Sequence, residues 1–188
     1  MTTDSRALKV GLAGGIGSGK SYVARLLAQR GIVVYDCDSA AKRLMRSEAI
    51  QQQLEQLLGC KPDKQALTRF LLASDANASA INAIVHPAVF ADFEQSGLHW
   101  LESGIMFESG ANNYVDRVVV VTAPEEVRIR RIMLRDAISR RQAVEWMQRQ
   151  WPQDRVRQLA DYEIVNDGQT DINEQLNTIL EQLCKTPF

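Results

Sequence analysis

A glycine-rich segment near the N-terminus contains the residues with the clearest chemistry. Residues 14–21 have the sequence GGIGSGKS, which matches the pattern G-x-x-x-x-G-K-[ST]. Glycines let a backbone approach a polyphosphate closely, and successive N–H groups can then point inward and form a nest for an anion. A lysine in the last position but one can bridge two phosphates, and a final serine can hold Mg²⁺ through its hydroxyl. The segment therefore predicts a site for a nucleoside triphosphate.

The residues expected to bind nucleotide are those of this loop. A flexible turn could contain the same residue types by chance, but an apolar run precedes the segment and a helical pattern follows it, as the motif requires. Lys20 is expected to neutralise the β- and γ-phosphates and so to take part in catalysis, and Ser21 is the expected protein ligand of Mg²⁺. The full set of expected contacts is Gly15, Ile16, Gly17, Ser18, Gly19, Lys20 and Ser21.

Two carboxylates, Asp36 and Asp38, follow the second apolar run of the chain. At the carboxyl end of a strand they would lie next to the glycine-rich loop. A carboxylate there can accept or orient the proton of an attacking hydroxyl, or bind Mg²⁺ through water. Alternatively, Asp38 only caps a helix that starts near Ser39. The position by itself leaves both interpretations open.

Seven arginines lie between positions 128 and 149. Such a run is normally the solvated face of a helix. A helix-loop-helix centred on residues 135–141 could instead close over the nucleotide as a lid, because guanidinium groups match the geometry of a phosphoryl group in transfer. Our hypothesis assigns the catalytic lid arginine to Arg140 first and to Arg135 second.

A parallel sheet is the element that must position these residues. Short apolar runs rich in β-branched residues alternate with helical patterns, which is typical of strands joined by crossover helices. A long, mostly helical stretch at 39–95 separates the second and third strands, and Pro87 is one of its expected breaks. The expected fold class is α/β, a P-loop NTPase-type parallel five-stranded sheet between helices. Strands are predicted at 10–13, 32–35, 98–106, 117–122 and 162–165, and helices at 20–30, 124–135, 139–150 and 172–183.

Composition excludes several classes of protein. The 188 residues carry a net charge of −1, which argues against a surface that coats nucleic acid. No apolar run approaches the roughly 20 residues that cross a bilayer, and residues 1–9 lack the pattern of a signal peptide. The three cysteines are scattered and form neither a zinc motif nor a disulfide framework. We therefore expect a cytoplasmic protein that binds neither nucleic acid nor membrane.

An ordered series of short motifs gives the chain a more specific resemblance. The chain resembles the dephospho-CoA kinase family, and the resemblance runs from about residue 10 to about residue 183. A P-loop is shared by many families, whereas this ordered series is not. The motifs are GGIGSGKS at 14–21, D-x-D at 36–38 with AA at 40–41, IVHP at 84–87, IMFE at 105–108, DRVVVV at 116–121, RD at 135–136, Gln150, AD at 160–161 and IVNDG at 164–168.

The resemblance implies an activity, its cofactors and a substrate. These are ATP-dependent phosphorylation of the ribose 3′-hydroxyl of dephospho-CoA to give CoA, the final step of CoA biosynthesis, with ATP and Mg²⁺. The implied architecture is a single P-loop kinase domain over residues 1–188, with its core at about 8–38 and 98–188. A helical CoA-side insertion at about 39–97 and a lid at about 135–150 complete it. The expected assembly is a monomer or a weak homo-oligomer.

The same resemblance implies roles for further residues. Asp38 becomes the catalytic base or hydroxyl-orienting group, and Asp36 its neighbour at the substrate. His86 would touch the CoA moiety, although a helix break at Pro87 with a surface histidine explains it equally. Glu108 would orient the substrate or a basic residue. Asn166 would lie in a loop that contacts adenine, and a simple turn explains the same residues.

Some residues depart from the family pattern. Cys37 stands where the family usually has alanine, and the segment 103–108 lacks a proline that many members have. A lid pair of arginine and isoleucine looks replaced by Glu145 and Trp146, which bears on any assignment of a single lid arginine. Two alternatives remain: another small P-loop kinase for a nucleoside, nucleotide or shikimate-like acceptor, or a non-catalytic ATP-binding module.

Overall fold

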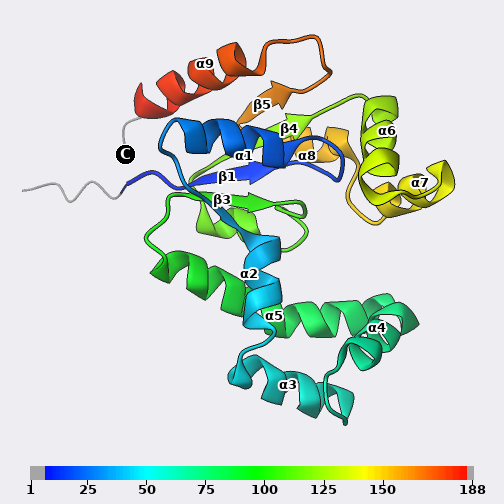
Figure 1. Ribbon diagram of the computed structural model, residues 1–188. Coiled ribbons are helices and arrows are strands. Elements are labelled where there is room, and N and C mark those ends of the chain that lie inside the picture. Colours follow the sequence, from blue (N-terminus) through cyan, green and yellow to red (C-terminus); the bar gives the residue numbers. More distant parts are fainter. Residues whose placement is uncertain (1–6, 186–188) are drawn as a thin grey trace, which may run out of the picture. The chain divides into compact units, whose positions relative to one another are not determined.

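The structure, a computed structural model that describes residues 7–185, contains a five-stranded parallel sheet (Figure 1). The strand order is β2-β3-β1-β4-β5, so β1 lies in the middle of the sheet. The fold class predicted from the sequence is therefore confirmed. The strands are β1 (Val10–Ala13), β2 (Val34–Asp36), β3 (Trp100–Ser103), β4 (Arg117–Thr122) and β5 (Tyr162–Val165).

The register of the sheet explains why the apolar runs form strands. Leu12 of β1 lies opposite Glu102 of β3 on one side and Val119 of β4 on the other. Residues 118–121 of β4 are all buried, as expected for a strand covered on both faces. Leu12, Val119 and Ile164 of three adjacent strands belong to one core cluster, which fixes the ends of these strands relative to one another.

Residues 7–35 and 98–185 form one compact unit with the sheet. Helices α1 and α9 lie on one side of the sheet, where their apolar residues join the core of β1, β4 and β5 (Figure 1). A short 3₁₀ helix, η1, lies between β3 and β4. The helices of this unit are α1 (Lys20–Gln29), α6 (Glu125–Asp136), α7 (Arg140–Gln148), α8 (Gln153–Leu159) and α9 (Ile172–Lys185), and η1 covers Ala111–Tyr114.

Residues 36–97 form a second compact unit, which is built from helices after Asp36, the last residue of β2. Its long helix α5 contacts each of the other three. Ile81, Val85 and Val89 recur at helical spacing on α5 and are buried, so this apolar stripe forms the core of the unit. The helices are α2 (Cys37–Leu44), α3 (Glu48–Leu58), α4 (Lys64–Ala73) and α5 (Asp75–Gln95).

Several boundaries differ from those predicted. The break expected at Pro87 is wrong, because α5 continues through it. A proline inside a helix removes one hydrogen bond and costs about 3 kcal/mol, and burial of the stripe on both sides of Pro87 offsets that cost. The third strand ends at Ser103, since Gly104 starts a turn, and helix α8 was not predicted.

Within residues 7–185, no helix is both long and apolar enough to cross a membrane.

Candidate functional site

The P-loop, residues 14–21, connects the end of β1 to the start of α1. Gly19 precedes α1 with φ of 101°, and Gly17 has φ of 80°, values that favour glycine. The N–H of Ser18 donates to the Gly15 carbonyl at 3.1 Å and closes a turn inside the loop. In the described part of the chain, the N–H groups of Gly17 and Gly19 donate to no acceptor. Together with the positive end of the α1 dipole, they can bind an anion.

Two other elements touch the P-loop so closely that glycine is required. A Cβ on Gly17 would lie 2.8 Å from the backbone carbonyl oxygen of Arg128 in α6. A Cβ on Gly19 would overlap the side-chain nitrogen of Asn166, which follows β5. The glycines therefore allow α6 and the end of β5 to hold the loop from outside.

Asn166 and Arg131 bind the carbonyl groups on the outer side of the P-loop. The Nδ2 group of Asn166 donates to the Ser18 carbonyl at 2.8 Å, and Nη1 of Arg131 donates to the carbonyls of Ser18 and Gly17 at 3.2 and 3.3 Å. Nη2 of Arg131 donates to Oδ1 of Asn166 at 2.9 Å, which links the two side chains. Asn166 is buried, and both of its side-chain polar atoms are used in this network. Asn166 follows β5, as expected, and its side chain supports the P-loop; the adenine contact expected of this loop stays a prediction.

Gln150 links the P-loop to the turn after β3. Its Oε1 accepts from the N–H of Ile16 at 2.7 Å, and its Nε2 donates to the Gly104 carbonyl at 3.1 Å. A Cβ on Gly104 would lie 3.7 Å from Nζ of Lys20, so the lysine amine lies next to this turn. One amide side chain thus spans two loops at the carboxyl edge of the sheet.

The arginines that contact the P-loop are Arg128 and Arg131, and the sequence hypothesis did not select them. Nε of Arg128 donates to the Ile16 carbonyl at 3.0 Å. The spacing of 128, 131 and 135 places three arginines on one helical face, and this spacing was an available signal.

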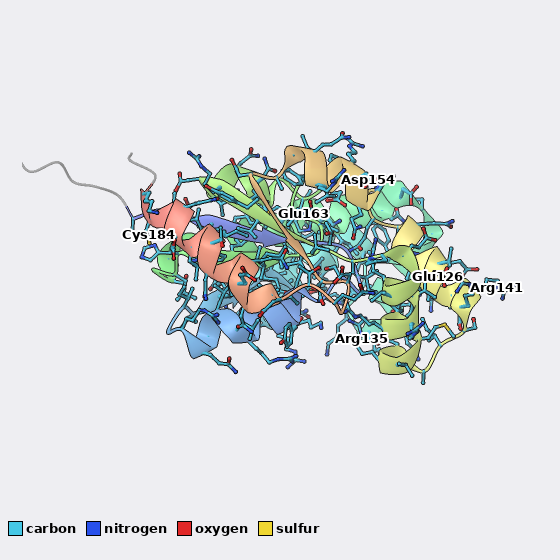
Figure 2. All side chains as sticks on the ribbon, turned by 90° about the horizontal axis from the view of Figure 1, so that it is seen from above. Glu126, Arg135, Arg141, Asp154, Glu163 and Cys184 are labelled. Carbon is cyan, nitrogen blue, oxygen red and sulfur yellow. The ribbon has the colours of Figure 1, made fainter. Side chains whose placement is uncertain are left out.

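Arg140 and Arg135, the two arginines selected from the sequence, are exposed and have acidic partners nearby. Arg140 pairs with Glu126 at 2.5 Å, and Arg135 pairs with Asp136 at 2.8 Å. The hydrogen bond from Arg140 lowers the pKa of Glu126 and raises the pKa of Arg140. Figure 2 shows Glu126 and Arg135 on α6 and Arg141 on α7.

Asp36 and Asp38 differ in their surroundings. Asp36 is the N-cap of α2, and its carboxylate accepts from the N–H groups of Asp38 and Ser39 at 2.9 and 3.1 Å and from the Ser39 hydroxyl at 2.6 Å. Burial raises the pKa of Asp36, but these bonds outweigh burial and leave the pKa lowered. Asp38 lies inside the first turn of α2, so the interpretation of Asp38 as the cap is wrong. Its side chain is exposed, and no group within residues 7–185 donates to its carboxylate.

His86 does not lie in a loop, whereas Glu108 lies in the turn that follows β3. His86 lies within α5, half-buried, with its ring 6.0 Å from that of Phe90, and burial lowers its pKa. Oε1 of Glu108 accepts from the N–H of Trp151 at 2.9 Å, which ties the turn after β3 to the segment between α7 and α8. Oε2 of Glu108 is buried and has no partner among the described residues. The guanidinium of Arg155 stacks over the Trp151 ring, 3.3 Å from its centroid.

The side chains of the described residues do not form a metal site by themselves. Residues 7–185 contain no group of three or more His, Cys, Asp or Glu side chains that could hold an ion. The Ser21 hydroxyl, exposed at the second position of α1, is the side chain of the P-loop that could hold Mg²⁺ beside a bound triphosphate.

A family model for dephospho-CoA kinase matches residues 8–171, which is most of the chain. The chain belongs to the dephospho-CoA kinase family. A dephospho-CoA kinase from Bacteroides fragilis is 35% identical over 184 residues, which cover 90% of this chain and 90% of that protein. The family resemblance inferred from the motifs is therefore confirmed.

Solved structures show the same fold. A crystal structure of a protein from Thermus thermophilus is 31% identical and has a TM-score of 0.83, covering 95% of this chain and 99% of that one. A dephospho-CoA kinase from Campylobacter jejuni, at 20% identity, shows the same fold with a TM-score of 0.66, over 94% of this chain and 97% of that one. As a member of a kinase family, the protein is an enzyme that uses ATP.

Proposed function

We propose that this protein transfers the γ-phosphoryl group of ATP to the ribose 3′-hydroxyl of dephospho-CoA and so completes CoA biosynthesis. The observation that supports this most is the P-loop of a chain in the dephospho-CoA kinase family, in which the N–H groups of Gly17 and Gly19 donate to no acceptor among the described residues. A small-molecule acceptor is consistent with the family.

The P-loop assigns the first part of the chemistry. Lys20, whose amine lies next to Gly104, would bridge the β- and γ-phosphates and neutralise charge as the bond to the leaving oxygen breaks. Ser21 would hold Mg²⁺, which when bound supplies positive charge to the β- and γ-oxygens. The N–H groups of Gly17 and Gly19, in a loop supported by the network of Asn166, would fix the phosphate chain in line with the acceptor.

Asp38 is the proposed residue at the acceptor hydroxyl. Asp38 lies in the first turn of α2, two residues after the end of β2. Its carboxylate is exposed and is not used as the helix cap, because Asp36 fills that role. It therefore keeps its lone pairs for a proton or a hydroxyl.

Asp36, His86 and Glu108 stay proposed substrate-side residues, and Arg140 stays the proposed lid arginine. The CoA-side role of residues 39–97, the lid at 135–150, the cytoplasmic location and a monomer or weak homo-oligomer also stay predictions.

The test is phosphate transfer to a panel of acceptors. Purified protein with Mg²⁺ and ATP is given dephospho-CoA, adenosine, AMP, pantetheine or shikimate, and ADP release is measured by a coupled assay. We expect turnover with dephospho-CoA well above that with any other acceptor. The Lys20→Ala variant, which removes an amine from a loop and leaves the core intact, should give no transfer and serves as the control for contaminating kinases. Preference for another acceptor would support the alternative of a different small kinase, and ATP binding without any turnover would support a binding module.

A further inference from the structure

Arg128 is a nearly buried cation that contacts the outer side of the P-loop. Arg128 exposes only 7% of its surface. Its Nε donates to the Ile16 carbonyl at 3.0 Å, and a Cβ on Gly15 would lie 2.5 Å from its Nη2. Because its backbone also lies against Gly17, Arg128 covers the loop from Gly15 to Gly17.

No acidic side chain balances this buried charge. Among residues 7–185, no carboxylate forms an ion pair with Arg128, and its Nη1 and Nη2 atoms donate to no acceptor. Burial lowers the pKa of the guanidinium, and the negative charge of Glu125 opposes this only in part. A buried charge without a counter-ion costs folding free energy, whereas the neighbouring arginines 135 and 140 have carboxylate partners at the surface.

The hydrogen bond from Arg128 to the Ile16 carbonyl polarises the peptide group between Ile16 and Gly17. In a trans peptide the C=O and N–H point in opposite directions, so the guanidinium binds the Ile16 carbonyl on one side and the Gly17 N–H points to the other. This N–H has no acceptor in the described structure. A charge-assisted hydrogen bond polarises the peptide, and a polarised N–H is a stronger donor to an anion.

We propose that Arg128 is a further polyphosphate-binding determinant of this enzyme, which acts through the Ile16–Gly17 peptide and places a positive charge one backbone layer behind the bound phosphates. The counter-ion of Arg128 is then the triphosphate itself. The inference rests on the proposed function in that ATP is taken as the ligand. Arg128 is a positioning residue, since it touches the loop and not the reacting atoms.

The test compares ATP affinity with stability in matched variants. Arg128→Gln removes the charge and keeps a donor, Arg128→Lys keeps the charge, and Arg130→Gln removes an exposed charge from the same helix. The dissociation constant of Mg²⁺-ATP is measured by titration calorimetry, and the urea midpoint is measured without nucleotide. We expect Arg128→Gln to bind ATP about tenfold more weakly, the scale of one charge-assisted hydrogen bond. Its urea midpoint should be no lower than that of the wild type, because an uncompensated buried charge is lost.

The remaining outcomes separate the alternatives. Arg128→Lys should bind ATP within about threefold of the wild type, and Arg130→Gln within about twofold. An unchanged ATP affinity in folded Arg128→Gln would show that Arg128 is only structural. If Arg128→Gln loses both ATP affinity and stability, the ATP affinity of Arg128→Lys decides. Weak ATP binding by Arg128→Lys, which keeps the positive charge, would also contradict the proposal. Wild-type protein that does not bind ATP at all would contradict the proposed function instead.

Discussion

Asp38 is the residue whose chemical role can be tested most directly. Replacement by Asn keeps the size of the side chain and leaves the cap of α2, Asp36, in place. We expect Asp38→Asn to lower kcat by about 10²-fold or more, which is the scale of general acid–base catalysis. The KM for ATP should stay near that of the wild type, because the P-loop is unchanged. Steady-state kinetics with dephospho-CoA measures both.

A second first-turn aspartate provides the matched control for Asp38. Asp75 is exposed in the first turn of α5, in the same helical unit. Asp75→Asn removes the same favourable interaction with a helix dipole, worth about 0.3–1 kcal/mol, without a proposed role in chemistry. Asp75→Asn should keep full activity. A fully active Asp38→Asn enzyme would remove Asp38 from the mechanism.

At the residue scale, the sequence predicted the identity of the P-loop but not the side chains that support it. The glycine spacing in 14–21 is a local pattern, and it was enough to locate the loop. Arg128, Arg131 and Gln150 contact the loop across more than a hundred positions of sequence. The spacing of 128, 131 and 135 indicates a shared helical face, but it does not indicate that this face meets the loop. Asp36 and Asp38 were both expected at the carboxyl end of a strand, but α2 begins at Cys37, so Asp36 caps this helix and Asp38 lies in its first turn.

At the level of elements, the end of α6 has one strained residue. Ala137 follows α6 with φ of 52°, the one positive value among the described non-glycine residues. An L-residue in this conformation costs about 1–2 kcal/mol, which glycine avoids. Ala137→Gly should therefore raise the free energy of unfolding by about 0.5–1 kcal/mol, after the greater chain entropy of glycine is counted. Urea unfolding measures the change.

The control for Ala137→Gly is the same substitution in an ordinary helical position. Ala28 is exposed in α1, so Ala28→Gly should lower the free energy of unfolding by up to about 1 kcal/mol. The two substitutions should thus have opposite signs. A loss of stability in both would mean that the backbone at 137 is not strained.

The elements themselves were predictable wherever the pattern was strong. The bounds predicted for β1, β4 and β5 agree with the structure, because apolar, β-branched runs of four to six residues end at polar or turn residues. The effect of Pro87 was predicted wrongly because its local preference conflicts with the packing of the whole helix. Proline tends to break a helix locally. Val85, Val89 and Phe93, however, are buried on one face only because α5 continues through Pro87.

At the scale of the whole molecule, the two compact units make a prediction about ligands. Bound ligand slows amide hydrogen exchange where it stabilises local structure. We expect ATP to slow exchange in the P-loop and in the start of α6, within the unit that contains the sheet. We expect dephospho-CoA to slow exchange within residues 36–97, if this unit is the CoA side. Hydrogen exchange followed by mass spectrometry, with AMP as the control ligand, measures both. Protection by dephospho-CoA confined to the sheet unit would contradict the CoA-side assignment.

The order of the strands has a consequence for the protein as it leaves the ribosome. The central strand β1 is made first, yet both of its neighbours, β3 and β4, come from residues beyond 99, and β2 is not next to it. At about 5–20 residues per second, the chain therefore spends several seconds with an apolar strand that has nothing to pair with. During that time the helices of residues 36–97, whose contacts are local in sequence, can already fold. We therefore expect a nascent chain that is released before residue 100 to hold a folded helical segment and an aggregation-prone N-terminus that chaperones would bind.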